Sequence, residues 1–102
     1  MRKIFFISVI VVLSVLAYLN RSKSSDLYDK TILKAAQRHQ VPFSLIKAVI
    51  RKESSFIARQ KGLAGEYGLM QIMPIAADEW ARLNKRKKMI HYDILLDPEI
   101  NI

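Results

Sequence analysis

The 102-residue sequence contains no cysteine, which excludes disulfide bonds and metal sites built on thiolates. A chain without cysteine suits an extracytoplasmic bacterial protein. Histidine, aspartate and glutamate nowhere cluster with the spacing of metal ligands, and no glycine-rich loop is placed to cradle a phosphate. Internal repeats and low-complexity tracts are also missing. We therefore expect a protein without a metal ion or a cofactor.

Acidic residues are absent from the first 25 positions, which carry the basic residues Arg2, Lys3, Arg21 and Lys23. The formal charge of the whole chain is +8. Residues 26–102 hold 13 basic and 9 acidic residues, so their own net charge is +4. Much of the basicity therefore belongs to the N-terminal segment.

Uncharged, mostly apolar residues run from Ile4 to Leu19. This length fits the apolar core of a signal peptide and falls just short of the roughly 17 to 25 residues of a spanning helix. Residues 1–25 are therefore predicted to be a signal peptide or an N-terminal membrane anchor that ends in a short polar tether, residues 20–25. In both cases residues 26–102, enough for one small domain, would lie outside the cytoplasm, in the periplasm or cell envelope.

Apolar residues recur at helical spacing in three later segments, which predicts helices over residues 27–39, 42–54 and 74–84. Asp26 is a plausible N-cap for the first of them, and a proline opens each of the other two. His39, near the end of the first, is expected to be a capping or packing residue. The predicted fold is all-α, with a hydrophobic helix at the N-terminus.

Glu53 falls on the apolar face of the second predicted helix, because Ile46, Val49 and Ile50 precede it by seven, four and three residues. An acid in apolar surroundings keeps its proton closer to neutral pH, which is the state that a general acid requires. The alternative is a glutamate at the helix end that has reached solvent or pairs with a base such as Arg59. Periodicity leaves both interpretations open.

A loop is predicted over residues 55–67, which hold two glycines and sustain no period. Residues 68–74 then place four large apolar side chains around Gln71. A buried amide requires hydrogen-bond partners, so Gln71 is expected to orient the acid or to hold a substrate group. Met70 and Met73 either fill the core or also line a cleft.

The runs AVIRKESSF (residues 48–56) and GEYGLMQIMP (residues 65–74) together resemble the catalytic motifs of the soluble lytic transglycosylase family. The lysozyme-like domains of this family cleave bacterial peptidoglycan. Gln71 follows Glu53 by eighteen residues, as in the family, and LLDPEINI (residues 95–102) is similar to its Asp-Pro-x-x-Asn-Ile element. The resemblance covers the whole extracytoplasmic part and implies a mostly helical domain of the lysozyme-like superfamily.

The resemblance implies that Glu53 acts as general acid and base on the bond between N-acetylmuramic acid (MurNAc) and N-acetylglucosamine (GlcNAc). It implies an anhydromuramoyl product and peptidoglycan glycan strands as the substrate. Substrate-binding or supporting roles are implied for Ser54, Tyr67, Met70, Gln71 and Met73. A hydrolytic, lysozyme-like muramidase and a truncated, non-catalytic module that binds peptidoglycan or a partner protein remain alternatives.

The loop departs from the family's pattern at Gly62, nine residues after Glu53. Many members have a serine at this position, and its hydroxyl supports the acid. Ala76 likewise stands where a threonine is common. Glu66 is the only other acid between residues 30 and 77, and its Gly-Glu-Tyr-Gly setting favours a role in loop structure over a second catalytic carboxylate.

The family's later Ala-Tyr-Asn-x-Gly stretch has no counterpart before Ile102. Asp97 and Pro98 nevertheless mark an N-cap and the first turn of another helix, with Glu99 placed favourably for the helix dipole. We therefore expect a truncated product or a fragment, which lacks the far side of the substrate groove.

Four consecutive cations, Lys85 to Lys88, follow the third predicted helix. Such a run is usually a solvated surface, and its alternative role is contact with anionic wall polymers or lipid headgroups. No nucleic-acid recognition motif accompanies it. The expected partners are therefore peptidoglycan and, if residues 4–19 are retained, the inner membrane.

Overall fold

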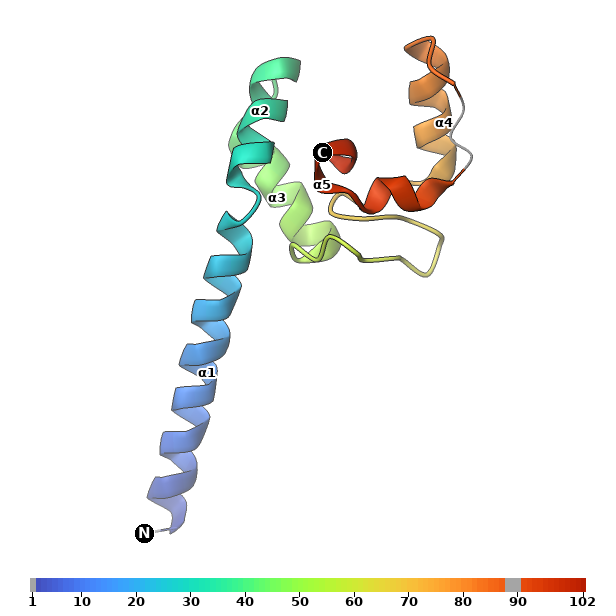
Figure 1. The fold of residues 1–102 in the computed structure, drawn as a ribbon. Coiled ribbons are helices and arrows are strands. Elements are labelled where there is room, and N and C mark those ends of the chain that lie inside the picture. Colours follow the sequence, from blue (N-terminus) through green and yellow to red (C-terminus); the bar gives the residue numbers. More distant parts are fainter. Residues whose placement is uncertain (1, 88–90) are drawn as a thin grey trace.

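The computed structural model describes residues 2–87 and 91–102. The elements within these residues are α1 (Arg2–Asp26), α2 (Asp29–His39), α3 (Phe43–Ser54), α4 (Pro74–Leu83), the 3-10 helix η1 (Tyr92–Leu96) and α5 (Pro98–Asn101) (Figure 1). The described ranges contain no strand, and two isolated bridges join Tyr67 to Lys61 and to Ile72. The predicted all-α fold is confirmed.

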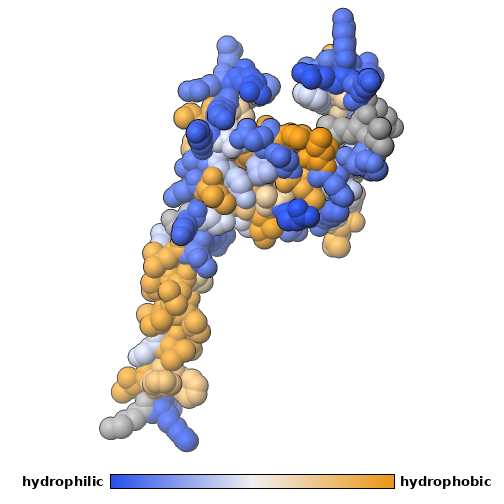
Figure 2. Space-filling model, viewed as in Figure 1, coloured by the Kyte–Doolittle hydropathy of each residue, from blue (hydrophilic) through white to orange (hydrophobic). Residues whose placement is uncertain are grey.

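Helix α1 projects away from the rest of the chain (Figure 1), and apolar side chains cover most of its surface (Figure 2). It is long and apolar enough to cross a membrane, and none of its most apolar stretch is buried in the protein. Residues 20–25, predicted as a polar tether, instead continue the helix to Asp26. No proline or glycine interrupts this stretch, so nothing in the local sequence breaks the helix.

Lys47 on α3 binds the junction between α1 and α2 through two carboxylates. Its ammonium group donates to the carboxylates of Asp26, at 3.1 Å, and Asp29, at 2.7 Å. The prediction that Asp26 caps the next helix is wrong, because α1 runs through it and Tyr28 takes the N-cap position of α2 without a side-chain hydrogen bond. Lys47 thus holds the end of the domain from which α1 emerges.

Helices α2 and α3 lie side by side and reverse the chain direction through a left-handed residue, Gln40 (φ 53°) (Figure 1). Their contact forms the core, and the loop after α3 completes it. The buried apolar side chains of this core are Ile32, Ala35, Ala36, Ile46, Ile50, Phe56 and Leu69. Leu69 is fully buried, which stabilises the fold by about 1.5–3 kcal/mol. The loop that carries Leu69 is therefore part of the core.

The helices predicted over residues 27–39, 42–54 and 74–84 begin and end within two residues of α2, α3 and α4. The predicted cap near the C-terminus is also present, since the backbone N–H of Glu99 donates to the Asp97 carboxylate at 2.8 Å. The helix that follows, α5, spans four residues.

The cationic run after α4 is described over Lys85, Arg86 and Lys87, whose side chains are exposed. Lys88, the fourth residue of the predicted run, lies outside the described residues. The exposure of the three described side chains agrees with the interpretation as a solvated surface.

Candidate active site

Glu53 lies in the last turn of α3, and its side chain is exposed. Among the described residues its carboxylate has no hydrogen bond and no ion pair. The apolar enclosure predicted from periodicity is therefore wrong. The buried stripe of α3 passes through Ile46, Ile50 and Ser54, and each step of four residues rotates it by about 40°. By the last turn the stripe has moved onto Ser54, and Glu53 faces solvent.

Ser54 is buried next to the acid and fastens α3 to the loop. Its hydroxyl donates to the backbone carbonyl of Leu69 at 2.7 Å and lies 3.1 Å from the carbonyl of Ile50. Both acceptors belong to the protein, and the residue is 5% exposed. Ser54 can therefore serve the site by fixing the backbone that carries Glu53.

The chain turns sharply after α3 because two successive residues, Ser55 (φ 50°) and Phe56 (φ 63°), adopt left-handed conformations. Such conformations are costly for residues with a Cβ atom and persist where the surrounding structure holds them. The turn places the Phe56 ring in the core, and the backbone N–H of Ile57 donates to the carbonyl of Ser54 at 3.0 Å. The loop is thus folded back on the end of α3.

Gln71 stabilises this loop by side-chain hydrogen bonds to the loop's own backbone. Its amide nitrogen Nε2 donates to the backbone carbonyls of Gln60, at 3.1 Å, and Gly68, at 2.8 Å. The prediction that a glutamine in this segment needs hydrogen-bond partners is confirmed. Both amide hydrogens are used, so the side chain has its oxygen Oε1 left to offer, and Gln71 can contact a ligand as an acceptor.

The other predicted site residues differ in their surroundings. Tyr67 is half-buried, exchanges backbone hydrogen bonds of 3.0 and 2.9 Å with Ile72, and has its ring centroid 6.4 Å from that of Tyr92. Met70 is half-buried against the core, whereas Met73 is 37% exposed at the start of α4. The structure therefore gathers Tyr67, Met70 and Gln71 in one turn.

Asn101, to which the sequence assigned no role, holds this turn from the C-terminal side. Its Oδ1 accepts from the backbone N–H of Met70 at 2.7 Å, and its Nδ2 donates to the carbonyls of Tyr67, at 2.8 Å, and Leu95, at 2.7 Å. The side chain is buried with these bonds formed. Its position in the Asp-Pro-x-x-Asn-Ile element was the signal in the sequence that could have indicated this role.

A positive charge lies beside Tyr67. The ammonium group of Lys61 is 5.5 Å from the centre of the Tyr67 ring and 2.9 Å from the carboxylate of Asp93. The hydrogen bond from Lys61 holds the pKa of the Asp93 carboxyl below its usual range. Within residues 2–87 and 91–102 no group of three or more histidine, aspartate or glutamate side chains is arranged to hold a metal ion.

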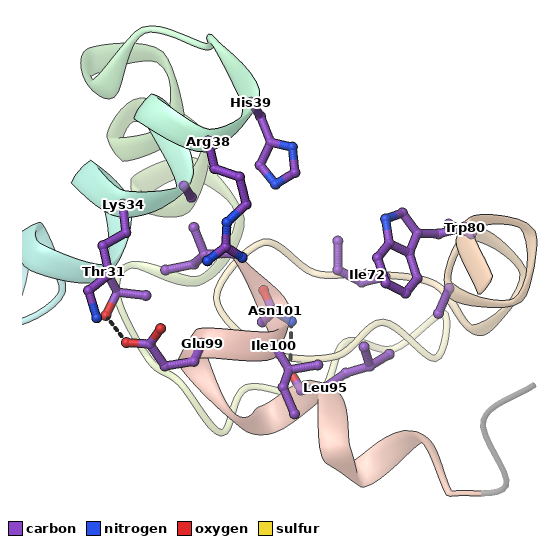
Figure 3. A pocket seen from close by; sticks show the side chains of 14 residues that line it. Thr31, Lys34, Arg38, His39, Ile72, Trp80, Leu95, Glu99, Ile100 and Asn101 are labelled. Carbon is purple, nitrogen blue, oxygen red and sulfur yellow. Dashed lines mark hydrogen bonds between the residues drawn. The ribbon is translucent and has the colours of Figure 1, made fainter. Parts of the chain in front are cut away.

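A cavity of about 460 Å³ opens between α2, α4 and the C-terminal residues (Figure 3). Arg38 and His39 line it from α2, and Trp80 lines it from α4. The Thr31 hydroxyl donates to the Glu99 carboxylate at 2.8 Å and joins α2 to α5 at this cavity. The predicted site residues do not line it, so the cavity is separate from the candidate acid.

One protein family matches most of this chain. The family model described as Transglycosylase SLT domain matches residues 30–102. The matched range contains Glu53, the loop with Gln71, and Asn101, and it leaves out α1. It therefore coincides with the helical domain built on α2 and α3.

Proposed function

Because the chain belongs to the transglycosylase SLT domain family, we propose that it is a lytic transglycosylase of the bacterial cell wall. Its substrate is the peptidoglycan glycan strand, cut between MurNAc and GlcNAc. The observation that carries the proposal is the state of Glu53, an exposed carboxyl group without a protein partner among the described residues, held in the last turn of α3 by its buried neighbour Ser54.

In the first step Glu53 donates its proton to the glycosidic oxygen as the bond to the MurNAc C1 carbon breaks. A general acid must reach the oxygen that it protonates, and an exposed carboxyl at a helix end can do so. The surroundings of Glu53 are open in the free protein. A glycan strand lying against the loop would exclude water from the carboxyl.

In the second step the Glu53 carboxylate takes the proton from the C6 hydroxyl of the same MurNAc residue. The C6 oxygen bonds to C1, which closes the anhydro ring, and no water is consumed. Hydrolytic glycosidases use two carboxylates to place a nucleophile or a water. Here the sugar itself holds the nucleophile next to C1, so one carboxyl group suffices for both proton transfers.

The turn at residues 68–71 supplies the surface against which the strand lies. Gln71 offers one acceptor oxygen, and Tyr67, Met70 and Met73 provide half-buried or exposed side chains beside it. Ser54 and Asn101 contribute by holding the backbone of this turn.

Helix α1 fits this function as an export signal or as an anchor in the inner membrane. Peptidoglycan lies outside the cytoplasm, so the domain after α1 must be delivered to the periplasm or cell envelope. The exposed apolar surface of residues 4–19 suits a lipid environment.

The test compares the full chain, Glu53→Gln and a matched control, Glu79→Gln, on purified sacculi in detergent. Glu79 is also an exposed glutamate, on α4, where it pairs with Arg82. The parent and the control are expected to release soluble muropeptides, and Glu53→Gln to release them at least about 100-fold more slowly, the usual contribution of a general acid. Equal rates for the parent and Glu53→Gln would remove the proposed role of this residue.

The alternatives predict other results in the same assay. A non-catalytic module would bind sacculi without releasing muropeptides. A hydrolytic muramidase would release muropeptides with a reducing MurNAc end, in place of the anhydro end.

A further inference from the structure

Gly62 lies directly against two acceptor oxygens. A Cβ atom built on Gly62 would be 1.9 Å from Oε2 of Glu66 and 2.7 Å from Oε1 of Gln71. Both distances are shorter than any van der Waals contact, so these oxygens fill the space that a side chain at residue 62 would need. The absence of a side chain at this position is what lets the two oxygens converge.

The loop's own hydrogen bonds hold both oxygens there. Oε2 of Glu66 accepts from the backbone N–H of Ala64 at 3.1 Å, and the Gly62 N–H donates to the Glu66 carbonyl at 2.9 Å. Oε1 of Gln71 is directed by the two bonds that Nε2 makes to backbone carbonyls. Hydrogen bonds within the loop therefore orient both oxygens.

The two oxygens have no common donor among the described residues. Gln71 uses both of its amide hydrogens elsewhere, and the Ala64 N–H contacts Glu66. Neither oxygen is a fully buried atom without a partner. Two acceptors that share a small space repel each other unless a donor lies between them. An N–H or O–H group of a ligand that donated to both oxygens would relieve this repulsion.

The pair belongs to the loop that is anchored next to Glu53. Ser54, the residue after the acid, donates to Leu69, and Gln60 links the two halves of the loop by accepting from both Gly68 and Gln71. Hydrogen bonds therefore connect the helix end that carries the acid to the loop that carries the acceptor pair.

We propose that Glu66 and Gln71 form an acceptor pair that binds one N–H or O–H group of the glycan strand, with Gly62 as the position whose missing side chain lets both oxygens lie there. The inference rests on the proposed function and deepens it, because it assigns Glu66 to substrate binding. Glycan strands offer two such donors, the acetamido N–H and the ring hydroxyls.

Binding of chitotetraose, an oligomer of four GlcNAc units, tests the pair by titration calorimetry on full-length chain in detergent. All variants carry Glu53→Gln, so that no oligomer is cleaved. Loss of one hydrogen bond to a charged acceptor should weaken binding by about tenfold in Glu66→Ala. Glu66→Gln keeps an acceptor oxygen and should lose less, and the control Glu79→Gln should bind like the parent.

Gly62→Ala provides a second, independent test of the pair. Gly62 is not among the residues with positive φ, so alanine brings no backbone strain, and its methyl group displaces the Glu66 carboxylate. Gly62→Ala should weaken binding about as much as Glu66→Ala does, and the double variant should bind no more weakly than Glu66→Ala. Thermal melting of each variant checks that the domain stays folded.

Cellotetraose, which lacks acetamido groups, distinguishes the two donors. If it binds but is indifferent to Glu66→Ala, the acetamido N–H is the donor; if Glu66→Ala weakens both oligomers equally, a hydroxyl is. The proposal is overturned if neither oligomer binds the parent, or if folded Glu66→Ala and Gly62→Ala bind chitotetraose like the parent. If the Glu53→Gln chain binds chitotetraose while the unsubstituted chain releases no muropeptides from sacculi, the lyase activity is refuted and the pair still stands.

Discussion

The backbone N–H of Met70 donates a hydrogen bond of 2.7 Å to the side-chain oxygen of Asn101, which lies 31 residues further along the chain. Through this bond the C-terminal element supports the turn that carries Gln71. The same carboxamide also donates to two backbone carbonyls, so one buried side chain satisfies three backbone groups. The geometry of the candidate site thus depends on a residue outside both catalytic motifs.

Asn101→Ala should lower the free energy of unfolding by about 2–3 kcal/mol, because the Met70 N–H and the Tyr67 and Leu95 carbonyls lose their partner. Denaturant unfolding followed by circular dichroism measures the change. Gln37→Ala, at an exposed position of α2, serves as the control and should stay within about 0.5 kcal/mol of the parent. An Asn101→Ala variant as stable as this control would contradict the assigned role.

Ser54→Ala should cost about 1–2 kcal/mol of stability, because the buried carbonyl of Leu69 loses its donor. It should also slow the release of muropeptides, since the backbone beside Glu53 is no longer tied to the loop. Stability and the rate of muropeptide release are measured separately. A variant that loses stability but releases muropeptides at the parent rate would show that Ser54 acts on the fold and not on the acid.

Gly68 and Gly65 make a matched pair, because both have left-handed backbones (φ 76° and 87°) but different surroundings. A Cβ on Gly65 meets nothing within 4 Å, so Gly65→Ala should cost about 1–2 kcal/mol, from the backbone conformation. A Cβ on Gly68 would lie 2.4 Å from the Leu95 carbonyl oxygen, so Gly68→Ala should cost about 1–3 kcal/mol more. Equal melting temperatures for the two variants would contradict the close approach.

Lys47 should make the domain's stability depend on pH at both extremes. Its hydrogen bond lowers the pKa of Asp26 from the usual 3.8, with a smaller contribution from Ser25. The hydrogen bond to Asp29 raises the pKa of Lys47 above 10.5. The Asp26 contribution is present above pH 3.8 and lost as the pH falls further. The Lys47 contribution is complete below pH 10.5 and lost as the pH rises further.

Lys47→Met tests this linkage. Between pH 3.8 and pH 10.5 the parent should melt at a higher temperature than Lys47→Met, and this difference in melting temperature should shrink below and above that range. The difference should be small and fall with added salt, because the carboxylates are exposed. A difference that is independent of pH would show that the packing of the Lys47 side chain, and not its charge, stabilises the junction.

The helices of the domain could be predicted because apolar side chains recur with a helical period on α2, α3 and α4. The end of α1 could not, because polarity at residues 20–25 was interpreted as a tether although these residues form helix readily. Asp26 consequently lies within a helix and pairs with Lys47, where the sequence predicted a cap.

The sequence indicated candidate site residues but not their surroundings. The motifs pointed to Glu53 and Gln71 as candidates, whereas burial of a helix face depends on what packs against each turn. At the end of α3 the returning loop covers Ser54 and leaves Glu53 exposed. The contacts of Asn101 and Glu66 join segments that are distant in sequence or folded into a turn, which periodicity does not encode.

The mass of the sugar at the new end of the released muropeptides tests the central claim most directly. Sacculi are digested with the full chain and with Glu53→Gln, and the soluble products are analysed by mass spectrometry. The account predicts that the parent yields MurNAc ends lighter by one water than a reducing end, and that Glu53→Gln yields almost none. Products with reducing MurNAc ends, or anhydro ends released equally by Glu53→Gln, would contradict it.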